Sequence, residues 1–414
     1  MPARPLDDDL LRRLATRFGT PLYVYHADII GRRIAELRSF DVIRYAQKAN
    51  SNLALLTWMR GQGVQVDAVS GWEVQRALRA GFSESEIVFT ADLFDRYTLD
   101  LLKQHDIHVN LGSPDMLEQY AGLRSSDGPG RSITLRINPG FGHGHDRKVT
   151  TGGRGSKHGT WHEQLPAIIE RAAGLGLTVT GIHMHIGSGS DFEHLSRVRV
   201  AMVDAVLTAS EHLNTFSVGG GLPVPYRPDD RPFDVQRYCA DWGATKAELE
   251  SRLGRSLVME VEPGRYLTAE AGLLLAEVRG VKTSGGLDYI LVDAGFDNLL
   301  RPAMYGAYHH ISILGRDGEP TAPRVVAGPL CESADAFTQT KGGLIEPRDL
   351  PAAQVGDILC LHTAGAYAAS MASNYNSRPL AAEVLVEGDQ VRLVRERQTI
   401  DDLLALEVDR REEE

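Results

Sequence analysis

A lysine stands close to the end of an apolar run in this 414-residue chain. The run Ile43–Ala46 has the composition of a buried β-strand, and Lys48 follows it by two residues. A lysine at the end of a buried strand can present its amine inside a pocket, where partial loss of water lowers the pKa of that amine. The unprotonated amine can then attack a carbonyl group and form a Schiff base. A solvated surface lysine is the alternative interpretation, so the other polar residues decide between the two.

Further residues able to do chemistry lie at the ends of other short apolar runs. Enzymes built from alternating strands and helices carry out their chemistry at the carboxyl ends of the strands, where side chains from several strands meet. A random scatter of polar residues would not keep this register, so we expect one shared site. The residues concerned are Asp67, Ser70, Arg136, Asn138, His183, His185, Ser188, Gly219, Gly220, Gly221, Glu262, Gly264 and Arg265.

Two histidines alternate with apolar residues in the run Val179–Ile186. Alternation in a strand places His183 and His185 on the same face. His185 is nearer the end of the run, where its flat imidazole could stack on a planar cofactor. For His183, a hydrogen-bonded position in the core is the favoured interpretation.

Two glycine-containing segments could bind an anion. The backbone N–H groups of Gly219–Gly221 could close around a phosphate, although a flexible turn would have the same composition. Glu262 stands next to Gly264 and Arg265, which places a carboxylate, backbone amides and a guanidinium together. Such a group suits a ring nitrogen and a phosphate or carboxylate, although an ordinary ion pair is the alternative.

Taken together, these groups predict binding of pyridoxal 5'-phosphate. Lys48 supplies the Schiff base, His185 the stacking ring and the glycines the phosphate cradle. Glu262 keeps the pyridine nitrogen protonated, so that the ring can accept the electron pair of a broken bond to the α-carbon.

Short β-branched runs alternate with helical patterns in the first 268 residues, which predicts an α/β fold. Eight such repeats match a (β/α)8 TIM-type barrel, although a doubly wound sheet also alternates strand and helix. The segments Trp72–Ala80 and Phe192–His212 are expected to be helices. The expected strands are Ile43–Ala46, Val64–Val69, Ile87–Thr90, Ile107–Leu111, Ile133–Asn138, Val179–Ile186, Phe216–Val218 and Val258–Val261.

The pattern changes after Arg265, where strand follows strand without intervening helices. This predicts a mainly antiparallel C-terminal β domain. We expect the barrel to span 31–268 and the β domain to combine 1–30 with 269–414, with Pro21–Tyr25 pairing there. The expected strands are Leu273–Val281, Tyr289–Asp293, Arg324–Ala327, Asp357–Leu361, Ala382–Val386 and Arg392–Arg395.

Composition narrows the class of protein. The chain has 43% hydrophobic residues and a formal net charge of -11. It has no basic cluster for nucleic acid, no apolar run long enough for a membrane span and no signal peptide. Cys239, Cys331 and Cys360 are too widely spaced for a disulfide framework or a zinc motif, and we expect no metal site. A cytoplasmic enzyme acting on a small molecule is the prediction.

At this level of detail the sequence resembles the diaminopimelate decarboxylases, within the larger family that includes the barrel-type ornithine and arginine decarboxylases. The resemblance runs from about Tyr23 to Leu406, and the joint order of its motifs is highly specific. The matching stretches are Ala46–Asn52, Val66–Gly71, Leu135–Gly140, Gly181–Ser188, Gly219–Gly221, Glu262–Arg265, Arg301–Gly306, Gly328–Ser333, Gly365–Tyr367 and Ser373–Pro379.

The resemblance implies a role for each matching residue. Lys48 would bond covalently to the cofactor and Cys331 would join it in catalysis. The cofactor-binding set would be Lys48, Asp67, His185, Ser188, Gly219, Gly220, Gly221, Glu262, Gly264 and Tyr367. The substrate-binding set would be Arg265, Arg301, Tyr305, Glu332 and Tyr367.

The resemblance also implies a homodimer. Cys331 and Glu332 would reach into the active site of the neighbouring subunit, so that the β domain contributes substrate and dimer-interface residues. Two positions depart from the usual family pattern, because Ala334 and Ala368 stand where glycine is common. Each adds a methyl group near the site, from which we expect slight local tightening.

The expected reaction is decarboxylation of meso-2,6-diaminopimelate to L-lysine and carbon dioxide. A substrate with a second amino-acid head needs both a cation and an acid, which Arg301 and Glu332 provide. A decarboxylase of another amino acid, such as a D-amino acid, is the alternative. A racemase of related fold should lack an acid such as Glu262, and a binding-only protein would have no need of Lys48 and Cys331. Either Cys331 or Lys48 could reprotonate the α-carbon.

Overall fold

The chain divides into two units in the computed structural model, which describes residues 6–123, 131–146, 148 and 150–408. We call the first the barrel unit, which consists of residues 30–225 and 231–268. The second, the sheet unit, consists of Met1–Ile29, Tyr226–Asp230 and Ala269–Glu414.

Eight parallel strands of the barrel unit form a closed ring, which confirms the predicted TIM-type barrel. Neighbours in the ring follow chain order, with β5 paired to β6 and the last strand, β10, paired to the first, β2. The strands are β2 (Val42–Ala46), β3 (Gln65–Ala68), β4 (Ile87–Ala91), β5 (His108–Leu111), β6 (Ser132–Asn138), β8 (Thr178–His183), β9 (Thr215–Ser217) and β10 (Val258–Val261), with the short β7 (Thr160–Trp161) beside β6.

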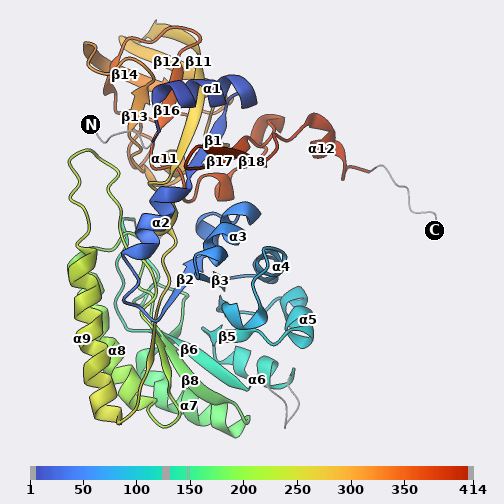
Figure 1. The fold of residues 1–414 in the computed structure, drawn as a ribbon, viewed down its shortest axis with the longest axis vertical. Coiled ribbons are helices and arrows are strands. Elements are labelled where there is room, and N and C mark those ends of the chain that lie inside the picture. Colours follow the sequence, from blue (N-terminus) through green and yellow to red (C-terminus); the bar gives the residue numbers. More distant parts are fainter. Residues whose placement is uncertain (1–5, 124–130, 147, 149, 409–414) are drawn as a thin grey trace. The chain divides into compact units, whose positions relative to one another are not determined.

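Helices alternate with these strands, and α8 and α9 run side by side along the barrel in Figure 1. Several begin at an Asp or Ser whose side chain accepts a hydrogen bond from the backbone three residues later, the usual N-cap arrangement. Ser70 caps α4, Asp95 caps α5 and Asp191 caps α8 in this way. The helices are α2 (Ala27–Ala35), α3 (Leu53–Gly61), α4 (Gly71–Arg79), α5 (Arg96–Gln104), α6 (Asp115–Ala121), α7 (Leu165–Gly174), α8 (Phe192–Thr208), α9 (Val235–Leu253) and α10 (Arg265–Thr268).

Two predicted elements extend three and four residues beyond the observed ones. Strand β8 ends at His183 and not at Ile186, because the chain leaves the hydrogen-bonded ladder although Met184 and Ile186 remain buried. Helix α8 ends at Thr208 and not at His212. The alternation argument therefore applies to His183 alone.

An ion pair lies inside the barrel between its first and last strands. Both guanidinium nitrogens Nε and Nη2 of Arg44 on β2 donate to the carboxylate of Glu260 on β10, at 3.0 and 2.6 Å. The two residues are only 6% and 8% exposed. A buried charge is tolerated only when it is paired and hydrogen-bonded, so this contact fixes how β2 and β10 meet.

The sheet unit contains a nine-stranded, mainly antiparallel sheet, as predicted. The N-terminal strand β1 pairs with β11 on one side and β17 on the other, which confirms the expected pairing of Pro21–Tyr25. The strands are β1 (Leu22–His26), β11 (Gly272–Ser284), β12 (Leu287–Val292), β13 (Ile311–Ile313), β14 (Thr321–Ala327), β15 (Arg348–Pro351), β16 (Ile358–Leu361), β17 (Ala382–Glu387) and β18 (Gln390–Arg395).

Three helices accompany this sheet: α1 (Asp8–Phe18), α11 (Arg301–Tyr305) and α12 (Ile400–Leu404). Leu11 and Leu14 of α1 pack in one apolar cluster with residues of β1 and β11, such as Leu22 and Leu275. Helix α1 was not predicted. The short strands β13 and β15 were also missed, because three or four residues carry too little periodicity to be recognised.

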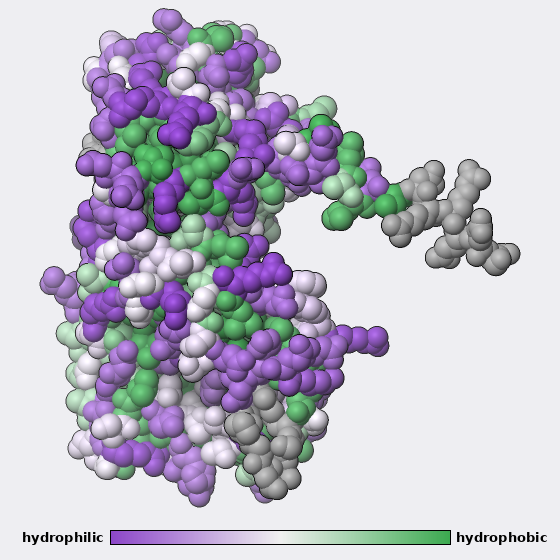
Figure 2. Space-filling view, turned by 45° about the vertical axis from the view of Figure 1, so that its right-hand side comes forward, coloured by the Kyte–Doolittle hydropathy of each residue, from purple (hydrophilic) through white to green (hydrophobic). Residues whose placement is uncertain are grey.

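Hydrophilic side chains predominate on the face drawn in Figure 2, with smaller hydrophobic areas between them. Among the described residues, no helix combines the length and the apolar character that a bilayer crossing requires.

Arg44→Met should lower the free energy of unfolding by about 3–5 kcal/mol, because it leaves the Glu260 carboxylate buried without a partner. Replacing both residues, Arg44→Met with Glu260→Leu, should recover most of that loss. Urea denaturation of the three proteins measures the difference. As a control, Lys246→Met removes the more exposed ion pair with Asp41 and should cost no more than about 1 kcal/mol. Equal losses for the two single variants would contradict this account.

Candidate active site

Lys48 lies in a single 3-10 turn, Gln47–Ala49, directly after β2. Its neighbours on both sides are buried, whereas the lysine itself is exposed. The turn is fixed at its start by the amide of Ala46, which donates to the carbonyl of Pro263 at 3.2 Å. The backbone is therefore held at the strand end. The lysine is more exposed than the sequence prediction of a partly desolvated amine in a pocket.

Glu262 lies one residue beyond β10 and is 8% exposed. Its Oε2 accepts a hydrogen bond from Nε2 of His183 at 2.7 Å, and its Oε1 accepts one from the Ser217 hydroxyl at 2.8 Å. Burial alone would raise the pKa of Glu262, but the charge and hydrogen bond of His183 and the bond from Ser217 outweigh it and lower the pKa to about 2. The carboxylate is thus ionised and held at both oxygens.

His183 is therefore a hydrogen-bonded core histidine, as predicted, and its partner is Glu262. Its sequence context could not identify Glu262 as that partner, because the two residues are far apart in the chain. Ser217 was also missed, since a serine inside a short strand carries no signal of its own. Both residues position Glu262.

Asp67, on β3, is the second buried acid of the barrel and is only 3% exposed. Its Oδ1 has no hydrogen-bond partner among the described residues. Burial and then the charge of Glu262 raise the pKa of Asp67 to about 7, against the opposing charge of Lys48. The two carboxylates therefore differ in protonation at neutral pH, which is how one site can use two acids differently.

His185 is half-buried and held by the glycine segment. The amide of Gly220 donates to its Nδ1 at 3.1 Å. In a neutral imidazole the proton then sits on Nε2. Burial first, and the charge of Lys48 second, hold the pKa of His185 well below its usual range. The ring is thus neutral and fixed in one orientation, as stacking on a planar group requires.

The three consecutive glycines are required by close backbone approaches. A Cβ on Gly219 would lie 2.2 Å from the carbonyl oxygen of Met184, and one on Gly220 would lie 2.2 Å from that of Glu262. A Cβ on Gly221 would meet the Gly187 carbonyl oxygen at 2.3 Å.

Two amides close to this backbone remain available. Within the described part of the chain, the amides of Gly221 and Gly264 donate to no other group. Backbone N–H groups without an acceptor in the protein are suited to bind a phosphate.

Ser188 and Arg265 are brought together by the fold. The guanidinium of Arg265 donates to the Ser188 hydroxyl through Nη2 at 2.9 Å and through Nε at 3.3 Å. Arg265 is 5% exposed. The structure thus joins a residue predicted to bind phosphate to one predicted to bind substrate.

A polar cavity of about 350 Å³ lies inside the barrel and is lined in part by Glu262. It extends from residues at the beginnings of strands, such as His108 and Ser132, to Ser217 at the end of β9. Its lining is Arg44, Ser85, Val88, His108, Asn110, Ser132, Thr134, Thr180, Asn214, Thr215, Ser217, Glu260 and Glu262. A lining this polar can hold water beneath Glu262, whereas an apolar cavity of similar size would stay dry.

Arg301 and Tyr305, predicted to bind substrate, begin and end α11 in the sheet unit. Arg301 is only 2% exposed, and its Nη1 lies 2.7 Å from Nε2 of His309. Its guanidinium also lies over the ring of Tyr226 at 4.6 Å. Arg301 can therefore contact a substrate only where the substrate is itself enclosed. Tyr305 is half-buried.

Cys331, Glu332 and Tyr367 also belong to the sheet unit. Cys331 and Glu332 are exposed, and the Cys331 amide donates to the side-chain oxygen of Asn376 at 2.9 Å. Tyr367 and Asn376 have φ angles of 58° and 54°, in a region that costs non-glycine residues energy. Strain of this kind concentrates at functional sites, and the sequence could not have shown it. Of the two departures from the family pattern, Ala368 is buried and Ala334 half-buried.

The barrel residues fit pyridoxal phosphate. This cofactor needs a lysine for covalent attachment, a flat ring for stacking, an acid for the ring nitrogen and donors for the phosphate. The barrel supplies an exposed lysine, a neutral fixed imidazole, an ionised buried carboxylate and two available amides at closely packed glycines. Residues 27–269 match the protein family described as "Pyridoxal-dependent decarboxylase, pyridoxal binding domain". Fold and site together define a barrel-type, pyridoxal-dependent decarboxylase.

Comparison with individual proteins narrows this class. The chain is 51% identical to a diaminopimelate decarboxylase of Escherichia coli, over 96% of both chains. A crystal structure of a diaminopimelate decarboxylase superposes with a TM-score of 0.92 at 50% identity, over 96% of both chains. Another, from Helicobacter pylori and complexed with L-lysine, gives a TM-score of 0.84 at 30% identity over 96% of this chain and 98% of that one. The chain belongs to the diaminopimelate decarboxylase family.

Asp67→Asn should stabilise the cofactor-free protein increasingly as pH rises from about 4 to about 7. In this window Asp67 stays protonated in the folded protein but ionises in the unfolded chain. The unfolded chain then binds fewer protons, so wild-type stability falls with rising pH by at most about 1.4 kcal/mol per pH unit. Asparagine does not ionise, so the variant escapes this loss. Urea denaturation of both proteins at about pH 5, 6 and 7 measures the effect.

A stability difference that does not vary with pH would be evidence against the raised pKa of Asp67. Glu262→Gln provides a second check, because the charge of Glu262 is the second cause of that shift. In a Glu262→Gln background, the pH range over which Asp67 lowers the free energy of unfolding should become narrower.

Proposed function

We propose that this protein decarboxylates meso-2,6-diaminopimelate to L-lysine and carbon dioxide with pyridoxal phosphate as cofactor. The observation that carries the proposal is the ionised Glu262 carboxylate, buried at the end of the last barrel strand and bonded at both oxygens. An anion in this position can hold a proton on a pyridine nitrogen. The identity of the substrate is inferred from the diaminopimelate decarboxylase family, to which the chain belongs.

The residues of the barrel unit would hold the cofactor. Lys48 would bond to it covalently, His185 would stack on its ring and Glu262 would bind the ring nitrogen. Bound in this way, pyridoxal phosphate supplies an electron sink for the bond to the carboxylate that leaves. The phosphate would be held by Ser188, Gly219, Gly220, Gly221, Gly264 and Tyr367. Asp67 would adjust the charge beside Lys48.

The substrate is distinguished by its second amino-acid head. Arg265, Arg301 and Tyr305 would bind the carboxylate of that head, and Glu332 would bind its ammonium group. A site built to pair such groups rejects analogues that leave them unpaired by about 10⁴–10⁵. A decarboxylase of another amino acid would keep the cofactor residues and change this set.

The α-carbon must be reprotonated after carbon dioxide leaves. The Cys331 thiol and the Lys48 amine are the two candidates for this proton transfer. The exposure of Cys331 in the single chain agrees with a role at a neighbouring subunit's site.

We propose in addition that the active unit is a cytoplasmic homodimer. Each site would combine Lys48 of one subunit with Cys331 of the partner subunit. Oligomers with two-fold symmetry bury the same patch on both subunits, so two equivalent sites would result.

Purified protein with pyridoxal phosphate should release carbon dioxide from meso-diaminopimelate and not from D- or L-lysine or D- or L-ornithine. Lys48→Ala should reduce the rate on the order of 10³-fold or more, because it removes the covalent attachment. Lys103→Ala, at an exposed lysine of α5, is the matched control and should leave the rate unchanged.

Release mainly from another amino acid would keep the cofactor chemistry and refute the proposed roles of Arg301 and Glu332. Absence of release from any substrate, despite cofactor binding, would refute the decarboxylase itself.

A mixture of Lys48→Ala and Cys331→Ala proteins should regain activity if sites are shared between subunits. Random exchange makes half the dimers mixed, and each mixed dimer has one intact site, so about a quarter of wild-type activity should return. The assay is carbon dioxide release after unfolding and refolding the mixture. No recovery, from subunits shown to exchange, would mean that each site is built from one chain.

A further inference from the structure

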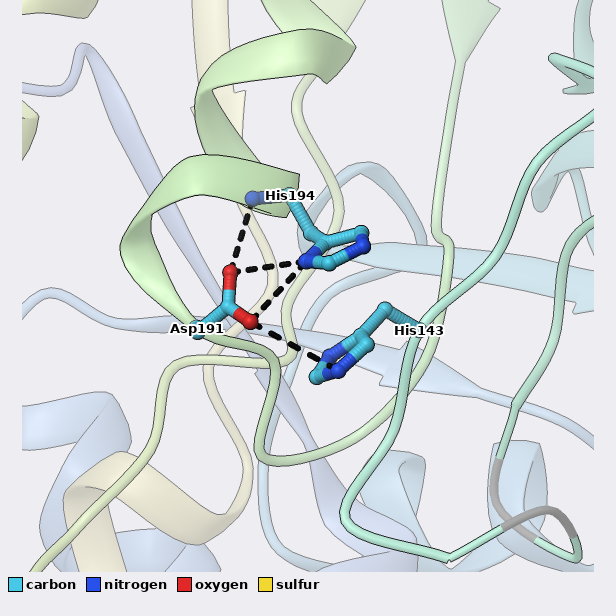
Figure 3. Close-up of side chains that lie close together, drawn as sticks. All are labelled: His143, Asp191 and His194. Carbon is cyan, nitrogen blue, oxygen red and sulfur yellow. Dashed lines mark hydrogen bonds and ion pairs between the residues drawn. The ribbon is translucent and has the colours of Figure 1, made fainter.

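The three residues His143, Asp191 and His194 lie together in the barrel unit, at the carboxyl end of β8 (Figure 3). Nδ1 of His194 lies 2.8 and 2.9 Å from the two carboxylate oxygens of Asp191. Nε2 of His143 lies 3.5 Å from Oδ2 of the same carboxylate. One possible ligand atom from each of the three residues lies within 4.8 Å of the other two.

We propose that His143, Asp191 and His194 bind one divalent transition-metal ion such as Zn²⁺. Two imidazole nitrogens and one carboxylate oxygen are a ligand set that suits Zn²⁺, Co²⁺ or Ni²⁺, whereas Mg²⁺ and Ca²⁺ prefer oxygen ligands alone. Three protein ligands leave a fourth position for water, as in open zinc sites. None of the three residues is among those assigned to the cofactor.

The spacings from the Asp191 carboxylate to the two imidazoles are close to those of a metal site. Ligands about 2.0–2.1 Å from a tetrahedral zinc ion lie about 3.3 Å apart. The distances from the Asp191 carboxylate to the two imidazoles, 2.8 to 2.9 Å and 3.5 Å, lie on either side of this value. A displacement of a few tenths of an ångström would satisfy each of these two ligand pairs.

The backbone holds all three residues in place. Asp191 is the N-cap of α8, and its Oδ1 accepts from the His194 amide at 2.8 Å. His143 is fixed by its amide, which donates to the Ile186 carbonyl at 3.1 Å, and by its carbonyl, which accepts from the Ser190 hydroxyl at 2.6 Å. The ligands are therefore pre-positioned on two segments that pack together.

The two imidazoles are stacked, with centroids 3.9 Å apart and planes 16° from parallel. A metal binds in the plane of an imidazole, so one ring must turn out of this stack. His143 can do so, because its Nδ1 has no hydrogen-bond partner among the described residues and a third of its side chain is exposed.

The carboxylate is in the state that a metal requires. Partial burial opposes ionisation of Asp191, but the hydrogen bonds and charge of His194 outweigh it and keep the pKa of Asp191 below its usual value. The bound ion would link the segment around His143 to the first turn of α8. No sequence motif indicated this site, because His143 and Asp191 are nearly fifty residues apart.

The test is titration of the full-length, untagged protein with Co²⁺ and Zn²⁺, with and without pyridoxal phosphate. Calorimetry should show one ion per chain at micromolar Kd, and bound Co²⁺ should develop visible absorption bands. His143→Gln and His194→Gln should each weaken binding at least about 100-fold. Asp191→Asn should do the same, while asparagine preserves the helix cap and the fold.

His212→Gln is the matched control, since this histidine is exposed at 61% and lies outside the cluster. It should bind as the wild type does. Absence of saturable binding at ion concentrations up to about 1 mM would overturn the proposal. A Kd of 1 mM corresponds to a binding free energy of about −4 kcal/mol. Binding that survives His143→Gln, or that is lost only in Cys331→Ser, would place the ion elsewhere and overturn it equally.

Discussion

The structure of the barrel mouth depends on one constraint, the burial of an ionised carboxylate at Glu262. A buried charge is costly unless hydrogen bonds replace the lost water. His183 and Ser217 supply these bonds, so β8 and β9 must each end at a fixed residue beside β10. The chain after β9 then packs so tightly on the Glu262 carbonyl that only glycine fits at position 220. The close packing of the glycine segment that is predicted to bind phosphate is thus linked to the way the acid is held.

Asp67 shows the same environment acting in the opposite direction. It is buried as deeply as Glu262, but one of its oxygens has no partner, and its pKa is raised where that of Glu262 is lowered. Neighbouring charges and hydrogen bonds therefore decide the charge of each acid, and burial alone does not. The protein keeps one permanent anion and one acid whose charge responds to its neighbours.

Sequence patterns predicted most of the barrel because its strands are short apolar runs separated by amphipathic helices. They failed where buried residues lie outside a strand. After His183 the strand ends, although Met184 and Ile186 remain buried. Arg44 and Glu260 were missed because a charged residue in a strand is normally expected to face solvent. The site residues that follow barrel strands could be inferred from the sequence. The partners of Glu262 and the cluster around Asp191 could not, because they depend on contacts between residues far apart in the chain.

The ion pair between β2 and β10 also affects how the chain can fold during synthesis. Arg44 and Glu260 are separated by 216 residues. At about 5–20 residues per second, a ribosome needs on the order of 10–40 s to make that stretch. Throughout this time Arg44 lacks the Glu260 carboxylate, and the ring of strands has an open edge. Closure of the barrel is therefore a late event, and one edge of the growing sheet stays unpaired until the last strand emerges.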